Sequence, residues 1–154
     1  MALMSGHRFS VDFDEAFPHG VFALSVVRAE DYHERTGKRT PAKDDRTGLA
    51  VWTVTCMDRD PEARSKEVKV KVLADLCPVL PGEIAPGTGM HAVVFTDLQV
   101  TPYVVEGAPG RRSQLGLSYR ATGLHALGKA PAASTPGRGA GQAPSGGSGD
   151  GKAA

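Results

Sequence analysis

The stretch VWTVTCMDRDPEARSKEVKVKV, residues 51–72, contains two segments in which apolar and polar side chains alternate. Such alternation predicts β-strands, because successive side chains of a strand point to opposite faces of the sheet. Val68, Val70 and Val72 then share one face of the second strand. Lys69 and Lys71 lie on the other face, which is either ordinary solvated surface or a contact surface for a polyanion.

Alternating segments also occur on both sides of this stretch. They predict five strands, at residues 21–33, 49–58, 66–74, 90–105 and 113–124. Pro102 should place the fourth strand at an edge, at a bulge or at a break, because proline cannot donate to a strand ladder. The connection DLCPVLPGEIAPGTG at 75–89 contains three prolines and three glycines, which argues against a helix there. We therefore expect an antiparallel sheet that is covered on one face only.

These strands predict an all-β domain, either a five-stranded antiparallel OB-like barrel or a small β-sandwich. The helix that an OB-fold usually has between its third and fourth strands would be replaced by the Pro/Gly connection. We divide the chain into an N-terminal extension at 1–20, a barrel-like domain at 21–128 and a tail at 129–154. The tail contains no aromatic residue and no Ile, Leu, Val or Met, so we expect it to be disordered.

The overall composition limits the function classes. The 154 residues carry a formal net charge of only +1, so binding to nucleic acid or membrane would have to come from local patches. Two cysteines are too few for a disulfide framework and are typical of a reduced compartment. No apolar run approaches the roughly 20 residues that span a bilayer, and the first residues lack a signal-peptide pattern. We expect a cytoplasmic protein with no membrane partner.

Basic residues gather where an OB-fold binds its ligands. That surface consists of the second and third strands together with the loops joining strands 1–2 and 4–5. Here these loops read ERTGKRTPAKDDRTG and EGAPGRRS. The candidate nucleic-acid contacts are Lys38, Arg39, Lys43, Lys69, Lys71, Arg111, Arg112 and Arg120. The alternative is that the strand lysines serve solubility or prevent edge-to-edge pairing, and both interpretations are open.

Three aromatic residues could stack on bases. Trp52 shares its face with Val54 and Cys56, which favours a core position over a stacking platform. Phe95 and Tyr103 share a phase along the fourth predicted strand, where they would either stack on bases or cover an end of the barrel.

No catalytic motif is found in the chain. The five histidines and two cysteines show no metal-ligand spacing, and no phosphate-binding glycine loop or nucleophile elbow occurs. We therefore expect no catalytic residues, no metal and no cofactor, and we interpret the chain as a protein that is not an enzyme.

Several phrases resemble a known family. FPHG, TGLAVWTVTCMDRDPEAR, KVKV, LQVTPYV and LSYRATGL occur in this order over about residues 17–124. Together they resemble the actinomycete activators of plasmid replication, integration and excision, the Pra-type proteins of integrative conjugative elements. The resemblance implies a small cytoplasmic accessory protein that promotes the replication and site-specific recombination functions of a mobile element. It supplies no catalytic or binding residues.

Two function hypotheses follow. The first is a non-enzymatic activator of plasmid or element replication, integration and excision that contacts DNA, single- or double-stranded, through an OB-like surface. The second is a protein-interaction module that assists a replication initiator or transcription factor without touching DNA. The basic loops favour the first hypothesis, and the near-neutral net charge favours the second.

Overall fold

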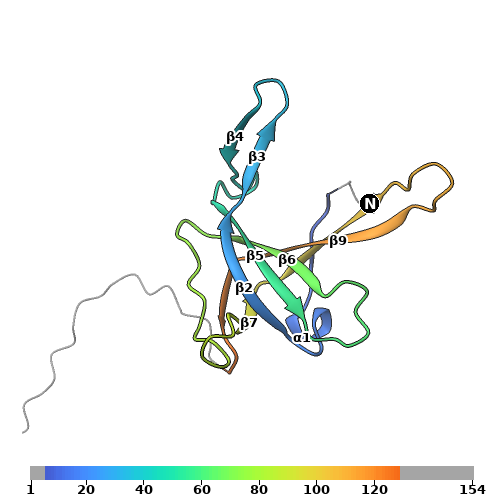
Figure 1. The fold of residues 1–154 in the computed structure, drawn as a ribbon. Helices are drawn as coiled ribbons and strands as arrows, with labels where there is room; N and C mark the ends of the chain where they lie inside the picture. Colours follow the sequence, from blue (N-terminus) through green and yellow to red (C-terminus); the bar gives the residue numbers. More distant parts are fainter. Residues whose placement is uncertain (1–5, 129–154) are drawn as a thin grey trace, which may run out of the picture.

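The computed structural model describes residues 6–128, and its regular secondary structure consists almost entirely of β-strands (Figure 1). The strands are β1 (Phe9–Ser10), β2 (Val21–Arg28), β3 (Glu30–His33), β4 (Lys38–Pro41), β5 (Val51–Asp58), β6 (Glu67–Leu73), β7 (His91–Thr96), β8 (Gln99–Val105), β9 (Gln114–Ala121) and β10 (Gly123–Ala126), and the single described helix is α1 (Phe13–Ala16). The predicted all-β class is confirmed. The tail predicted to be disordered, 129–154, lies outside the described residues.

Eight strands form one sheet in the order β1-β8-β9-β6-β5-β2-β7-β10, and this sheet curls into a half-barrel. The strands β3 and β4 form a separate two-stranded hairpin that projects from the body (Figure 1). The prediction of a five-stranded barrel is therefore wrong in its strand count. The predicted strand at 21–33 is divided, because β2 ends at Arg28 and β3 leaves the sheet to pair with β4.

The fourth and fifth predicted strands are each divided by a bend. Asp97, between β7 and β8, has a φ of 49°, in the left-handed region that ordinary residues seldom adopt. The pairing nevertheless keeps one register across the bend. Gln99 lies opposite Arg120 in the β8–β9 ladder, and Thr96 lies opposite Gly123 in the β7–β10 ladder. The four segments thus form one bent antiparallel ladder, which contacts β6 on one side and β2 on the other.

The core confirms the predicted strand phase. Val54 and Cys56 of β5 and Val70 and Val72 of β6 are fully buried. Val54 lies directly opposite Val70 in the antiparallel pair, so the two side chains pack on the same face. Burying each valine side chain contributes about 1.5–3 kcal/mol relative to leaving it in water.

Trp52 lies at the rim of this core and is only partly buried. Its indole Nε1 donates a hydrogen bond to the carbonyl oxygen of Ala74 at 3.0 Å. The guanidinium carbon of Arg28 lies 5.3 Å from the ring centroid, within the range of a cation–π contact. With its N–H bonded and one face near Arg28, Trp52 has a structural role.

The N-terminal segment packs on the sheet. β1 pairs with β8, and Phe17, just after α1, is one of the core residues. The ring centroid of Phe17 lies 5.1 Å from the ring centroid of Tyr119 on β9. Residues 6–20, which we set apart as an extension, therefore contribute to the same core as the strands.

Two of the phrases noted in the sequence meet in space. In FPHG, Gly20 has a φ of 78°, and its N–H donates to the carbonyl of Phe17 at 2.9 Å. The carbonyl of Gly20 accepts a hydrogen bond of 3.2 Å from the N–H of Arg59, the first arginine of DRDPEAR. The guanidinium of Arg59 lies 4.7 Å from the ring centroid of Phe22. The FPHG turn and the DRDPEAR segment thus contact each other directly.

Two smaller predictions are confirmed. The connection between β6 and β7 contains no helix. β1 pairs only with Gln99 and Val100 of β8. Pro102 lies beyond these residues in β8 and therefore occupies an edge position.

No helix in residues 6–128 has the length and apolar character needed to span a bilayer.

Candidate nucleic-acid interface

Polar side chains form cross-strand rows on the outer face of the sheet. Thr53 of β5 lies opposite Lys71 of β6, and Lys71 lies opposite Arg120 of β9. Thr55 and Lys69 form the neighbouring pair on the same face. Because Val70 and Val72 alternate with these lysines and are buried, the lysines occupy the face that the sequence predicted.

A groove runs along this face, and we call it the lysine groove. Its volume is about 840 Å³, and it is lined by Thr53, Ser65, Glu67, Val68, Lys69, Lys71, Tyr103, Leu117, Ser118 and Tyr119. Its charged lining consists of two lysines and one glutamate. The Nζ of Lys69 lies 3.7 Å from Oε1 of Glu67, but both side chains are largely exposed, so this ion pair contributes little. The groove is therefore a modestly basic surface with an aromatic and aliphatic lining.

Lys71 is the more unusual of the two lysines because it is half-buried. Within residues 6–128 no carboxylate forms an ion pair with its ammonium group. Burial lowers the pKa of Lys71, repulsion from Arg120 lowers it further, and Asp31 opposes both effects. A partly desolvated cation of this kind gains more from an anionic ligand than a fully solvated lysine does.

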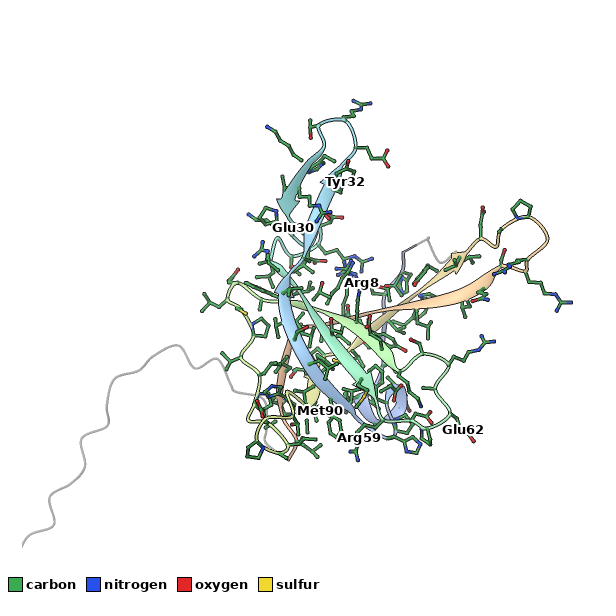
Figure 2. All side chains as sticks on the ribbon, viewed as in Figure 1. Arg8, Glu30, Tyr32, Arg59, Glu62 and Met90 are labelled. Atoms are coloured by element: carbon green, nitrogen blue, oxygen red, sulfur yellow. The ribbon has the colours of Figure 1, made fainter. Side chains whose placement is uncertain are left out.

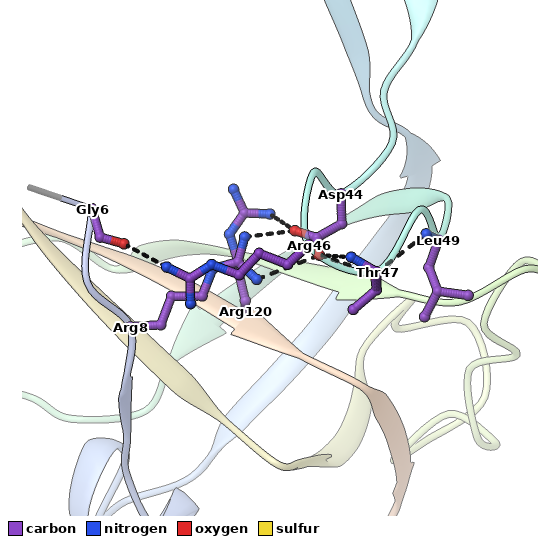
Figure 3. A network of polar contacts seen from close by, with 7 residues as sticks. All are labelled: Gly6, Arg8, Asp44, Arg46, Thr47, Leu49 and Arg120. Atoms are coloured by element: carbon purple, nitrogen blue, oxygen red, sulfur yellow. Dashed lines mark hydrogen bonds and ion pairs between the residues drawn. The ribbon is translucent and has the colours of Figure 1, made fainter.

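Arg120 is held by a buried carboxylate, as Figure 3 shows. Asp44 is only 3% exposed. Its Oδ1 accepts a hydrogen bond of 2.6 Å from Arg8 and a longer one of 3.4 Å from Arg120. Its Oδ2 accepts hydrogen bonds from the N–H and the hydroxyl of Thr47 at 3.1 and 2.9 Å. Arg120 is thus partly committed to an internal ion pair, unlike Lys71.

The pKa of Asp44 reflects the same contacts. Burial alone would raise it, but the hydrogen bonds from Arg8 and Thr47 and the charge of Arg8 outweigh burial and lower the pKa to about 2. Sequence reasoning missed this cluster. The DDRTG turn carries a recognisable signal, since an aspartate that bonds the backbone a few residues on and a glycine with positive φ are typical of turns. Nothing in the sequence connects Arg8 to it.

A smaller cavity of about 300 Å³ brings three of the predicted contacts together. Lys43, Lys71 and Arg120 line it, together with Arg8. The same lining contains four carboxylates, from Glu30, Asp31, Asp44 and Asp45. Because the charges balance, this cavity has no preference for an anion, and the lysine groove is the better candidate for a phosphate contact.

The remaining predicted contacts lie on two projections. Lys38 and Arg39 belong to the exposed hairpin strand β4. Nη1 of Arg39 lies 3.9 Å from Oε2 of Glu30 on the partner strand. Figure 2 shows Glu30 and Tyr32 out on this hairpin and Arg8 back at the body. Arg111 and Arg112 are exposed residues of the loop that joins β8 to β9. Figure 1 shows that this loop ends a second projection. The two pairs of basic residues therefore flank the sheet on separate arms and do not form one patch with Lys69 and Lys71.

The two aromatic stacking candidates of the fourth predicted strand have different environments. Phe95 is 3% exposed and packs near Phe13, so of its two predicted roles stacking on bases is excluded. Tyr103 is 50% exposed and lines the lysine groove. Phe95 and Leu98 both lie in the core although they differ in phase, because the bend at Asp97 shifts the alternation by one residue.

The cysteines and histidines give no indication of chemistry. Cys56 is buried, and burial raises the pKa of its thiol to about 12, so it stays protonated at neutral pH. Cys77 is an exposed free thiol. In the part of the chain that the structure describes, no group of three or more His, Cys, Asp or Glu side chains could hold a metal ion.

Comparison with known proteins found no matching family model, no matching curated protein and no matching solved structure. The function is therefore inferred from the described residues and from the family resemblance of the sequence.

Proposed function

We propose that this chain is a non-enzymatic accessory protein of the cytoplasm that activates replication, integration and excision of a plasmid or integrative mobile element. We further propose that it acts by contacting the DNA backbone through the lysine groove. The observation that carries the DNA contact is Lys71, which is half-buried and forms no ion pair among the described residues. Lys69 adds a second, exposed cation to the same groove.

The strand pairings support an OB-like surface. β2 pairs with β5, β5 with β6, and β6 with β9, the last pair being parallel. β9 and β10 pair with β8 and β7 in one bent ladder, and β7 in turn pairs with β2. The series of pairings therefore begins and ends at β2. Counted in this way, β5 and β6 are the second and third strands, whose outer face binds ligands in OB-folds. The lysine groove lies on this face.

The biological process rests on the resemblance to the Pra-type activators. Two of the phrases that carry the resemblance, FPHG and DRDPEAR, are joined by the hydrogen bond between Arg59 and Gly20. This contact assigns no binding role to either phrase.

A competing function, a protein-interaction module that does not touch DNA, is favoured by the β8–β9 arm. Val104 and Leu115 lie opposite each other in the register of this arm and are 66% and 71% exposed. Exposed apolar side chains clustered on one element are typical of protein contact surfaces. A partner such as a replication initiator would bury them on association.

The two functions are separated by titrating labelled single- and double-stranded DNA with the full chain at several salt concentrations. A backbone contact predicts measurable binding whose affinity falls as salt rises, because bound cations release counterions from the phosphates. Absence of binding to both forms of DNA at low salt would overturn the DNA contact and favour the protein-interaction module.

A further inference from the structure

Tyr103 of β8 and Gly116 of β9 lie directly opposite each other in the antiparallel ladder. A Cβ atom placed on Gly116 would collide with three atoms of the Tyr103 ring. The ring therefore lies across the glycine backbone, in a position that any other residue at 116 would obstruct. One part of the side chain is covered by the strand, and half of its surface stays open to solvent.

The open part of Tyr103 faces a groove that also contains cations. Tyr103, Leu117 and Tyr119 line the lysine groove together with Lys69 and Lys71. A flat aromatic surface beside ammonium groups matches the chemistry of an unpaired nucleotide, whose base stacks while its phosphate binds a cation. The bases of a duplex are stacked on each other and cannot reach such a ring unless one is flipped out.

From this geometry we infer that Tyr103 is a stacking platform for an unpaired base and that the lysine groove takes single-stranded DNA. This inference rests on the proposed DNA contact and specifies its substrate class. Gly116 is then a positioning residue, since the absence of a side chain at this position lets the Tyr103 ring lie where it does. The alternative role of Tyr103 is to shield Gly116 and stabilise the arm, as aromatic residues do beside strand glycines.

The test compares two labelled single strands of equal length, about 12 nucleotides, within the usual site size of such surfaces. One is oligothymidine and the other is an abasic strand with the same phosphates but no bases. Stacking of one base predicts that the full chain binds oligothymidine about 5- to 150-fold more tightly than the abasic strand. Phosphate contacts alone predict equal affinities.

Three variants assign the difference to the ring. Tyr103→Ala should remove the preference for oligothymidine, whereas Tyr103→Phe should keep it, because phenylalanine retains the stacking surface. Tyr32→Ala is the matched control, since Tyr32 is an exposed tyrosine on the β3–β4 hairpin and does not line the groove. Because the two strands are compared within each variant, a change in the amount of folded protein does not alter the ratio.

The outcomes distinguish this inference from the proposed function. Salt-dependent binding of both strands with equal affinity would overturn stacking and leave the backbone contact in place. A Tyr103→Ala protein that still prefers oligothymidine would also overturn the inference, because the base would then be bound elsewhere. No binding to either strand or to duplex would overturn both proposals together.

Discussion

Lys71 and Arg120 lie opposite each other on the parallel strands β6 and β9, yet within residues 6–128 only Arg120 has a carboxylate partner. Asp44 neutralises part of the charge on Arg120, which leaves Lys71 as the half-buried cation of the outer face. Burial lowers the pKa of Lys71, and repulsion between the two side chains lowers it further. An anionic ligand at Lys71 would relieve that repulsion.

The Asp44 cluster predicts a stability loss in acid. The pKa of Asp44 is about 2 in the folded protein against 3.8 in the unfolded chain, so its contribution is present above about pH 4. It is lost as the pH falls from about 4 to about 2, and it amounts to about 2 kcal/mol. Urea unfolding of the parent and of Asp44→Asn between pH 2 and pH 6 measures it. We expect the difference between them to shrink toward pH 2; a constant difference would contradict the assignment.

Trp52→Ala should destabilise the protein by about 3 kcal/mol, at the lower end of the range for large aromatic residues. The ring is partly buried and its Nε1 bonds the carbonyl of Ala74, so the variant loses packing and leaves that carbonyl without its partner. Chemical unfolding followed by circular dichroism gives the free energy of unfolding. A variant with parental stability but weakened DNA binding would instead show that the indole contacts the ligand.

Gly20→Ala should destabilise by about 1–2 kcal/mol, because an L-residue in the left-handed region pays this cost. Its φ is 78°, and no atom lies closer than 3.9 Å to the added methyl position, so strain is the only cost. Gly82→Ala is the control, since its added methyl would meet nothing within 4 Å and its φ is not in the left-handed region. Thermal unfolding of both variants tests whether the FPHG turn requires its glycine; equal melting temperatures would show that it does not.

The local pattern of the sequence predicts the strands and their buried faces well. Val68, Val70 and Val72 alternate with charged residues, and alternation alone assigns them to the covered face. It fails at Asp97, where a left-handed residue bends the chain and shifts the phase, so that Phe95 and Leu98 both enter the core. Aspartate adopts this conformation more often than most residues do, but its presence does not require it.

The candidate site depends on contacts between distant parts of the chain. Arg8 and Asp44 are 36 residues apart, and Asp44 and Arg120 are 76 residues apart. No periodicity or spacing connects such positions, so the sequence placed Arg120 among the free cations and did not identify Arg8. The pairing of Tyr103 with Gly116 was equally inaccessible, because it depends on the register of the β8–β9 ladder.

The most direct test of the DNA contact is the salt dependence of DNA binding by the double variant Lys69→Gln/Lys71→Gln, measured by fluorescence anisotropy. The control is Arg64→Gln, which removes a positive charge from an exposed arginine that lies outside the groove and outside the two basic loops. Loss of two phosphate contacts predicts weaker binding and a logarithmic salt slope reduced by about 1.4–1.8. Stability should change by no more than about 0.5 kcal/mol, and the control should keep the parental slope. A double variant that binds DNA with parental affinity and parental slope would contradict the account.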